Sequence, residues 1–135
     1  MIGLDTNILV RYLAQDDPVQ SPIATHIVES RLTEKDPGFI SVVVMVETVW
    51  VLDRAYALAA SEIVAALEHI LQADTLVVES EQEVFQATMA LKEGAGSFAD
   101  ALIAALGTKA GCTHTLTFDK SASKLPGFRL ATGAS

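Results

Sequence analysis

The sequence predicts an α/β fold in which helices cover both faces of a mostly parallel central sheet. Short apolar segments of strand length alternate with longer segments whose apolar residues recur at helical spacing. Capping side chains stand at several strand-to-helix junctions, and Gly, Pro and Asn residues punctuate the chain at short intervals. No tandem repeat or low-complexity block divides the 135 residues, so we predict a single domain over residues 1–135.

The predicted elements follow from these patterns in chain order. The strands are short apolar runs, which cover residues 1–4, 39–40, 75–78, 115–117 and 128–130. The helices follow a capping residue or show helical periodicity, and they cover residues 8–13, 23–32, 42–52, 61–71, 80–92 and 101–106. A capping box of Ser80 and Glu83 opens the fifth helix, and Gly111 ends the last one.

Two of these helices are apolar enough to predict burial. Residues 42–52 are rich in β-branched side chains that also suit a strand, but the run is long for a strand and follows Ser41, a helix cap. We therefore predict a buried helix with Trp50 in the core. Residues 101–106 are apolar on every side, which also predicts burial. The single cysteine, Cys112, is predicted to be a small buried residue.

Composition restricts the cellular context and the partners. One cysteine cannot form an internal disulfide, and the chain shows neither a leader pattern nor an apolar run of roughly 20 residues, so we expect a protein of the cytoplasm without a membrane span. The 17 acidic residues outnumber the nine basic ones, giving a formal net charge of -8. This balance argues against a general polyanion-binding protein.

Four acidic residues stand at positions where they can converge. Asp5 ends the first strand and Asp119 follows the strand of residues 115–118, so both can project from one edge of a parallel sheet. Glu47 and Asp100 are the only acids inside the two most apolar helices. Each has an ordinary structural explanation: Asp5 as a helix cap, Asp100 in a capping box with Ser97, Glu47 on a solvated face, and Asp119 in a turn.

The joint pattern of acids points to a divalent cation. Carboxylates gathered without nearby Lys or Arg repel one another, and one or two ions with oxygen ligands, Mg²⁺ or Mn²⁺, remove that repulsion. Such an ion activates water beside a phosphodiester and supplies the positive charge that the chain lacks. The sequence therefore predicts hydrolysis of a nucleic-acid backbone. Three basic residues are candidates for phosphate contacts or plain surface residues: Arg11, Lys120 and Lys124.

The chain resembles PIN-domain nucleases and, among them, VapC-type toxins. The resemblance rests on four segments in order along nearly the whole chain: residues 4–11 (LDTNILVR), 46–50 (VETVW), 98–104 (FADALIA) and 115–120 (TLTFDK). It implies a three-layer α/β/α fold with a mostly parallel sheet. It also implies Mg²⁺- or Mn²⁺-dependent cleavage of RNA at an acidic pocket of Asp5, Glu47, Asp100 and Asp119.

The resemblance further implies supporting residues and partners. Thr6 and Asn7 would support the first aspartate, Thr117 would fix a carboxylate or a metal-bound water, and Ser97 is a further member of this group. The implied partners are an RNA substrate, a second copy of the chain in a homodimer, and a cognate antitoxin whose C-terminal segment fills the groove of the toxin.

Other functions are less well supported by the sequence. No Gly-x-Ser-x-Gly motif accompanies the three scattered histidines, and Gly94-x-Gly96 follows a helix rather than a strand, which argues against a serine hydrolase and a dinucleotide site. An aspartate-nucleophile phosphatase would place a second aspartate where Asn7 stands. A receiver-like signalling domain would not need Glu47, and a PIN-like scaffold used only for interactions stays an alternative.

Overall fold

The computed structural model describes residues 1–133 as two compact units, one of Met1–Glu81 and the other beginning at Gln82. The first unit contains a three-stranded parallel sheet, and the second contains a two-stranded parallel sheet. The parallel strands confirm that part of the sequence prediction. The prediction of one domain stays a prediction.

The sheet of the first unit has the strand order β1–β2–β3. Its strands are β1 (Ile2–Gly3), β2 (Gly38–Ile40) and β3 (Leu76–Val78). β2 lies in the middle, with Gly3 paired to Phe39 and Phe39 paired to Val77. The backbone N–H of Leu4 donates to the carbonyl of Phe39 at 2.9 Å, which extends the pairing of β1 up to the residue before Asp5.

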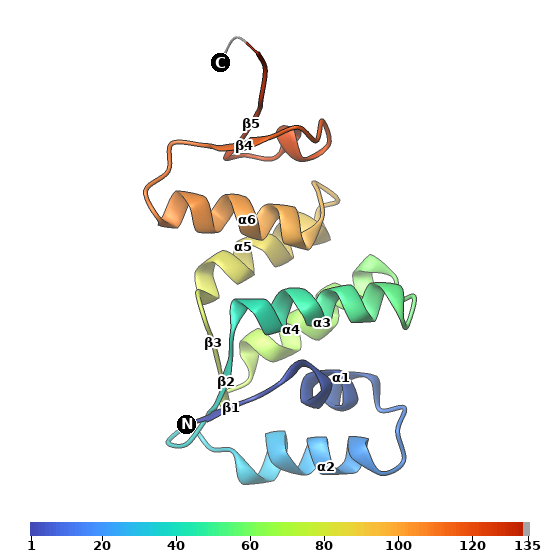
Figure 1. Ribbon diagram of the computed structural model, residues 1–135. Helices are drawn as coiled ribbons and strands as arrows, with labels where there is room; N and C mark the ends of the chain where they lie inside the picture. Colours follow the sequence, from blue (N-terminus) through green and yellow to red (C-terminus); the bar gives the residue numbers. More distant parts are fainter. Residues whose placement is uncertain (134–135) are drawn as a thin grey trace. The chain divides into compact units, whose positions relative to one another are not determined.

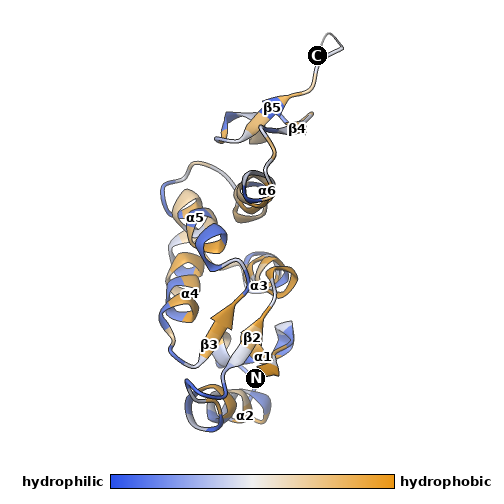
Figure 2. Cartoon of the chain, turned by 90° about the vertical axis from the view of Figure 1, so that its left-hand side faces the viewer, coloured by the Kyte–Doolittle hydropathy of each residue, from blue (hydrophilic) through white to orange (hydrophobic). Residues whose placement is uncertain are grey.

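Helices surround this sheet within the first unit (Figures 1 and 2). They are α1 (Thr6–Ala14), α2 (Gln20–His26), α3 (Val42–Arg54) and α4 (Ala60–Gln72). α2 continues into a π-helical turn at Ile27–Arg31, which together with α2 occupies the single helix that the sequence predicts over residues 23–32. α1 packs against both α2 and α3, which places the beginning of α1 beside the middle of α3.

Residues Val42–Arg54 form a helix, as predicted, despite their many β-branched side chains. Ser41 begins it because its hydroxyl accepts a hydrogen bond from the backbone N–H of Val44 at 3.2 Å. Met45, Thr48 and Leu52 are fully buried and share one helical face. Burial of this face stabilises the helix against the local β propensity of its residues.

Two expectations about burial are wrong. Trp50 is 59% exposed because it stands two positions after Thr48, roughly 200° around the helix from the buried face. Cys112 is exposed in the turn that follows α6 (Phe98–Lys109). Ser80 has a left-handed φ of 52°, and its predicted capping box with Glu83 stays a prediction.

The second unit is built from two helices and two strands. α5 (Glu81–Lys92) begins at the boundary between the units, and α6, β4 (Thr115–Thr117) and β5 (Phe128–Leu130) follow it. Gly111, with a φ of 99°, lies just after α6 and confirms the predicted terminator. α6 buries Phe98, Leu102 and Ala104 but leaves Ile103 half exposed, so the expectation of burial on every side is wrong.

β4 and β5 run parallel, with Thr115 opposite Phe128 and Thr117 opposite Leu130. A 3₁₀ turn at Ala122–Lys124 lies in the crossover between them. None of the helices in residues 1–133 is both long enough and apolar enough to cross a bilayer.

Candidate functional site

Two of the four predicted acids, Asp5 and Glu47, line one pocket of the first unit. The pocket has a volume of about 400 Å³ and opens between the beginning of α1 and the outer face of α3. Its lining combines the two carboxylates with polar and apolar groups: Asp5, Thr6, Asn7, Val10, Arg11, Glu47, Val51, Ala55 and Tyr56. Five of the residues named in the sequence analysis thus lie together in this lining: Asp5, Thr6, Asn7, Arg11 and Glu47.

Asp5 is positioned by the helix that it begins. Its backbone is extended, with φ −83° and ψ 162°, and its Oδ1 accepts a hydrogen bond from the backbone N–H of Thr6 at 2.8 Å. This hydrogen bond confirms the predicted capping role. The carboxylate is exposed at the pocket, so the same side chain starts α1 and presents a charge to a ligand.

Glu47 is joined to α1 through Thr6. The buried Thr6 hydroxyl donates a short hydrogen bond to Oε1 of Glu47, which connects residues 41 positions apart in the sequence. Glu47 itself is exposed, in agreement with the ordinary structural explanation that places it on a solvated helix face. The hydrogen bond fixes one carboxylate oxygen of Glu47 at Thr6, the residue that follows Asp5.

A guanidinium group also lies in this pocket, that of Arg11, which the sequence analysis names as a candidate for phosphate contacts. Arg11 donates through Nε to Oε1 of Gln20 at 2.8 Å, and its Nη1 forms an ion pair with Oδ1 of Asp16 at 3.3 Å. Nη1 also donates to the Tyr56 hydroxyl at 3.1 Å, and that hydroxyl donates to Oδ2 of Asp16 at 2.8 Å. Three polar partners thus fix the place of Arg11.

The sequence alone did not identify Tyr56 or Asp16 as members of this site. Tyr56 lies just after α3, and Asp16 lies in the loop that follows α1. The hydrogen bond to Asp16 raises the pKa of the Tyr56 hydroxyl, with partial burial as the next cause. The 40 positions that separate these two residues left no local pattern by which to pair them.

Asp100 and Ser97 lie at the beginning of α6 in the second unit. The Ser97 hydroxyl accepts a hydrogen bond from the backbone N–H of Asp100 at 3.1 Å, which confirms the predicted cap. Asp100 is half-buried in the first turn of α6, where the positive end of the helix dipole stabilises a carboxylate.

Asp119 follows β4 and organises the turn that begins there. Its Oδ1 accepts hydrogen bonds from the backbone N–H groups of Ser121 at 2.8 Å and Ala122 at 3.3 Å. Its own backbone N–H donates to the Thr117 hydroxyl at 3.0 Å, so Thr117 holds the main chain of Asp119. Lys120 and Lys124 are exposed in the same turn region.

The four predicted acids are divided equally between the two units. Asp5 and Glu47 share a pocket in the first unit, whereas Asp100 and Asp119 belong to the second. Within either unit, residues 1–133 contain no group of three or more His, Cys, Asp or Glu side chains close enough to hold a metal ion together. The convergence of all four acids on one site stays a prediction.

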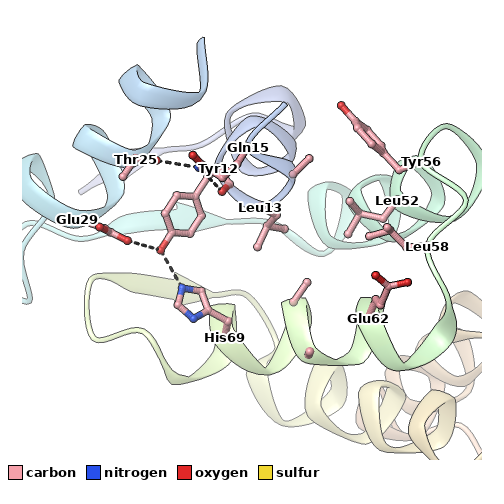
Figure 3. A pocket seen from close by; sticks show the side chains of 13 residues that line it. Tyr12, Leu13, Gln15, Thr25, Glu29, Leu52, Tyr56, Leu58, Glu62 and His69 are labelled. Carbon is pink, nitrogen blue, oxygen red and sulfur yellow. Dashed lines mark hydrogen bonds between the residues drawn. The ribbon is translucent and has the colours of Figure 1, made fainter. Parts of the chain in front are cut away.

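A second pocket of the first unit, of about 660 Å³, lies between α1, α2 and α4 (Figure 3). At one end the Tyr12 hydroxyl donates to Oε2 of Glu29 at 3.1 Å and lies 2.8 Å from Nε2 of His69. Burial raises the pKa of Tyr12, and the hydrogen bond to Glu29 raises it further. Neither Asp5 nor Glu47 lines this pocket, and no pattern in the sequence predicts it.

The family comparison agrees with the fold and with the order of the motifs. The PIN domain family matches residues 2–127, a range that includes all four predicted acids. A search of curated proteins finds none that matches the chain. PIN domains have the α/β architecture predicted from the sequence, are in general nucleases, and typically use divalent metal ions. Because the match covers nearly the whole chain, this protein belongs to the PIN domain family.

Proposed function

We propose that this protein is a divalent-metal-dependent endoribonuclease that hydrolyses RNA phosphodiester bonds. The observation that carries the proposal is the pocket in which Asp5 and Glu47, from different helices of a PIN domain, lie together and are linked through Thr6. Among PIN domains, nuclease activity is the general rule. RNA is the substrate favoured by the similarity of the four motifs to VapC-type toxins.

The donor groups of the pocket fit a hard cation such as Mg²⁺ or Mn²⁺. Asp5 and Glu47 offer carboxylate oxygens, and the amide of Asn7 offers a further oxygen on the same lining. We propose that Asp100 and Asp119 complete this set from the second unit. A cation bound there would neutralise charge on the phosphate and lower the pKa of an attacking water.

The residues of the chain have separate tasks in this proposal. The backbone N–H of Thr6 orients the Asp5 carboxylate, and the Thr6 hydroxyl orients Glu47. Both contacts hold the acids in place before a ligand arrives, which reduces the loss of side-chain freedom on binding. The Ser97 and Thr117 hydroxyls instead accept from the backbone N–H groups of Asp100 and Asp119, and so fix the main chain at these two acids.

The proposal extends to the biological setting implied by the motifs. The nuclease would act as the toxin of a VapC-type toxin–antitoxin pair in the cytoplasm, and a cognate antitoxin would inhibit it. A homodimer is its proposed assembly. Exposed apolar side chains of the first unit, Trp50 and Val43 among them, leave surface that a protein partner can cover.

Thr6→Val tests the orientation of Glu47 without altering the shape of the buried side chain. Loss of the hydroxyl donor should weaken Mg²⁺ or Mn²⁺ binding by roughly 10- to 100-fold, as expected for a group that orients a metal ligand. Thr6→Ser keeps the donor and should retain most of the affinity. Calorimetric titration of both variants measures the difference, and equal affinity in the two would contradict the orienting role.

The proposed activity is tested by titrating wild-type protein and Asp100→Asn with Mn²⁺ while RNA cleavage is followed in the same samples. We expect wild type to bind the ion and cleave, and Asp100→Asn to lose both, because the variant removes one of the proposed ligands. Asp74→Asn, outside the four acids, makes the matching change of charge as a control. Metal binding without cleavage of any RNA, or no binding even with RNA present, would favour a scaffold used only for interactions.

A further inference from the structure

Arg11 is the one basic side chain among the nine residues that line the acidic pocket. The pocket otherwise carries the two carboxylates Asp5 and Glu47, which repel the phosphate of an RNA strand. A bound cation offsets that repulsion at one point. The guanidinium of Arg11, on the lining of the same pocket, offsets it at a second point, so the position of Arg11 matters for the same ligand.

The hydrogen bonds of Arg11 leave one nitrogen of the guanidinium, Nη2, available to a ligand. Nε donates to Gln20, and Nη1 donates to Asp16 and Tyr56. Within residues 1–133, none of the described hydrogen bonds involves Nη2, whose two N–H groups remain donors for a ligand. A guanidinium fixed in this way presents its free donors without losing further side-chain freedom.

Tyr56 is the residue that connects Arg11 to Asp16. Its hydroxyl accepts from Nη1 of Arg11 and donates to Oδ2 of Asp16, so the three side chains form a closed ring of hydrogen bonds. A tyrosine hydroxyl carries its proton at neutral pH, so it can donate to Asp16 while it accepts from Arg11. The ring joins the loop after α1 to the end of α3, and Tyr56 itself lines the acidic pocket.

We propose that Arg11 contacts a phosphate of the RNA strand through Nη2 and that Tyr56 is the positioning residue that aims it. This inference rests on the proposed function, since it assigns two residues of the same pocket to the binding of its substrate. Arg11 acts by binding, and Tyr56 acts through Arg11 by preventing the guanidinium from turning toward solvent.

The test measures binding and cleavage of a labelled single-stranded RNA by wild type, Arg11→Gln and Tyr56→Phe. Binding is followed by fluorescence anisotropy over a range of salt concentrations with Ca²⁺ in place of Mn²⁺. Arg11→Gln should weaken binding about tenfold and reduce the slope of log affinity against log salt by about 0.7, the value for one phosphate contact on a single strand. Tyr56→Phe should weaken binding about fivefold, the effect of one hydrogen bond.

Two control variants separate positioning from general damage. Tyr12→Phe removes the other tyrosine hydroxyl of the first unit, which lies in the second pocket, and should leave RNA binding unchanged. Arg31→Gln removes an exposed arginine and matches the change of net charge in Arg11→Gln.

In cleavage assays, Tyr56→Phe should raise KM with little change in kcat, because it loses ground-state binding. Arg11→Lys keeps the charge but not the fork of donors and should fall between wild type and Arg11→Gln.

The outcomes distinguish this inference from the proposed nuclease activity. If wild type cleaves RNA but Arg11→Gln binds and cleaves equally well, the proposed phosphate contact is refuted and the proposed nuclease activity is retained. If wild type binds RNA without cleaving it and Arg11→Gln loses affinity and salt dependence, the proposed phosphate contact is supported and the proposed nuclease activity is refuted. Equal effects of Tyr56→Phe and Tyr12→Phe on binding, or a fall in kcat alone, would overturn the positioning role of Tyr56.

Discussion

Asp5→Asn is expected to lower the rate of RNA cleavage by at least about 10³-fold, which corresponds to roughly 4 kcal/mol in the activation barrier. The substitution removes a charged oxygen from the pocket where Asp5 and Glu47 lie together. It should not unfold the protein, because an asparagine side chain is as good a helix cap as aspartate and can accept the hydrogen bond from the Thr6 N–H. Single-turnover cleavage at saturating Mn²⁺ measures the fall in rate, and thermal unfolding measures whether the variant stays folded.

Asp53→Asn is the matched control for this experiment. Asp53 is exposed on α3, pairs with Arg54 at 3.6 Å and is absent from the pocket lining, so its loss changes the net charge by the same amount. We expect near-wild-type cleavage from it. A folded Asp5→Asn variant with full activity would refute a mechanism that depends on the Asp5 carboxylate.

Ile40→Ala should lower the free energy of unfolding by about 2–5 kcal/mol. Ile40 is fully buried in β2, the central strand of the first unit, where it pairs with Val78 of β3. Removal of its side chain leaves a cavity in the close-packed core at a position held by its pairing with Val78, so the surroundings cannot easily close around it. Urea unfolding followed by far-UV circular dichroism gives the change.

Val77→Ala provides the comparison on the neighbouring strand. Val77 lies in β3 opposite Phe39 and is 42% exposed, so its truncation removes little buried apolar surface. The loss of stability should stay below about 1 kcal/mol. Equal losses from the two substitutions would mean that the side of the sheet occupied by Ile40 is not the core of the unit.

Local sequence signals were sufficient to predict most elements of the fold. Asp5, Ser41 and Ser97 each begin a helix with a side-chain cap, and each cap stands directly before an apolar helical segment. The three observed strands of the first unit are short apolar runs ending near a cap or turn. Such signals lie within a few neighbouring residues, which is why they can be recognised without knowledge of the tertiary structure.

Burial was less predictable than secondary structure because it depends on the orientation of each helix. Apolar residues surround most of α3, so composition gave no means of choosing its inward face, and Trp50 was assigned to the core although Met45, Thr48 and Leu52 occupy it. The exposure of Glu47 follows from the same choice of face. Its link to Thr6 joins α1 to α3 and had no local signature.

The candidate site shows the same division between local and distant information. The acids were predicted because each stands at a strand end or in an apolar helix, and the order of the motifs indicated the family that the comparison then identified. The ring of Arg11, Asp16 and Tyr56 was not predicted, since its members look like ordinary surface residues until the folded chain brings them together. Convergence of Asp100 and Asp119 on the first pair stays a prediction.

The extreme shortness of β1 restricts how this part of the sequence can change in evolution. Only Leu4 separates the two-residue strand from Asp5, and its backbone is already held by Phe39. An insertion or deletion of one residue between Gly3 and Asp5 would therefore turn the carboxylate away from the pocket or move it off the helix cap. Related sequences should accept conservative apolar replacements in this segment but keep its length constant. A change in the length of the loop after α1 would not alter the position of Asp5.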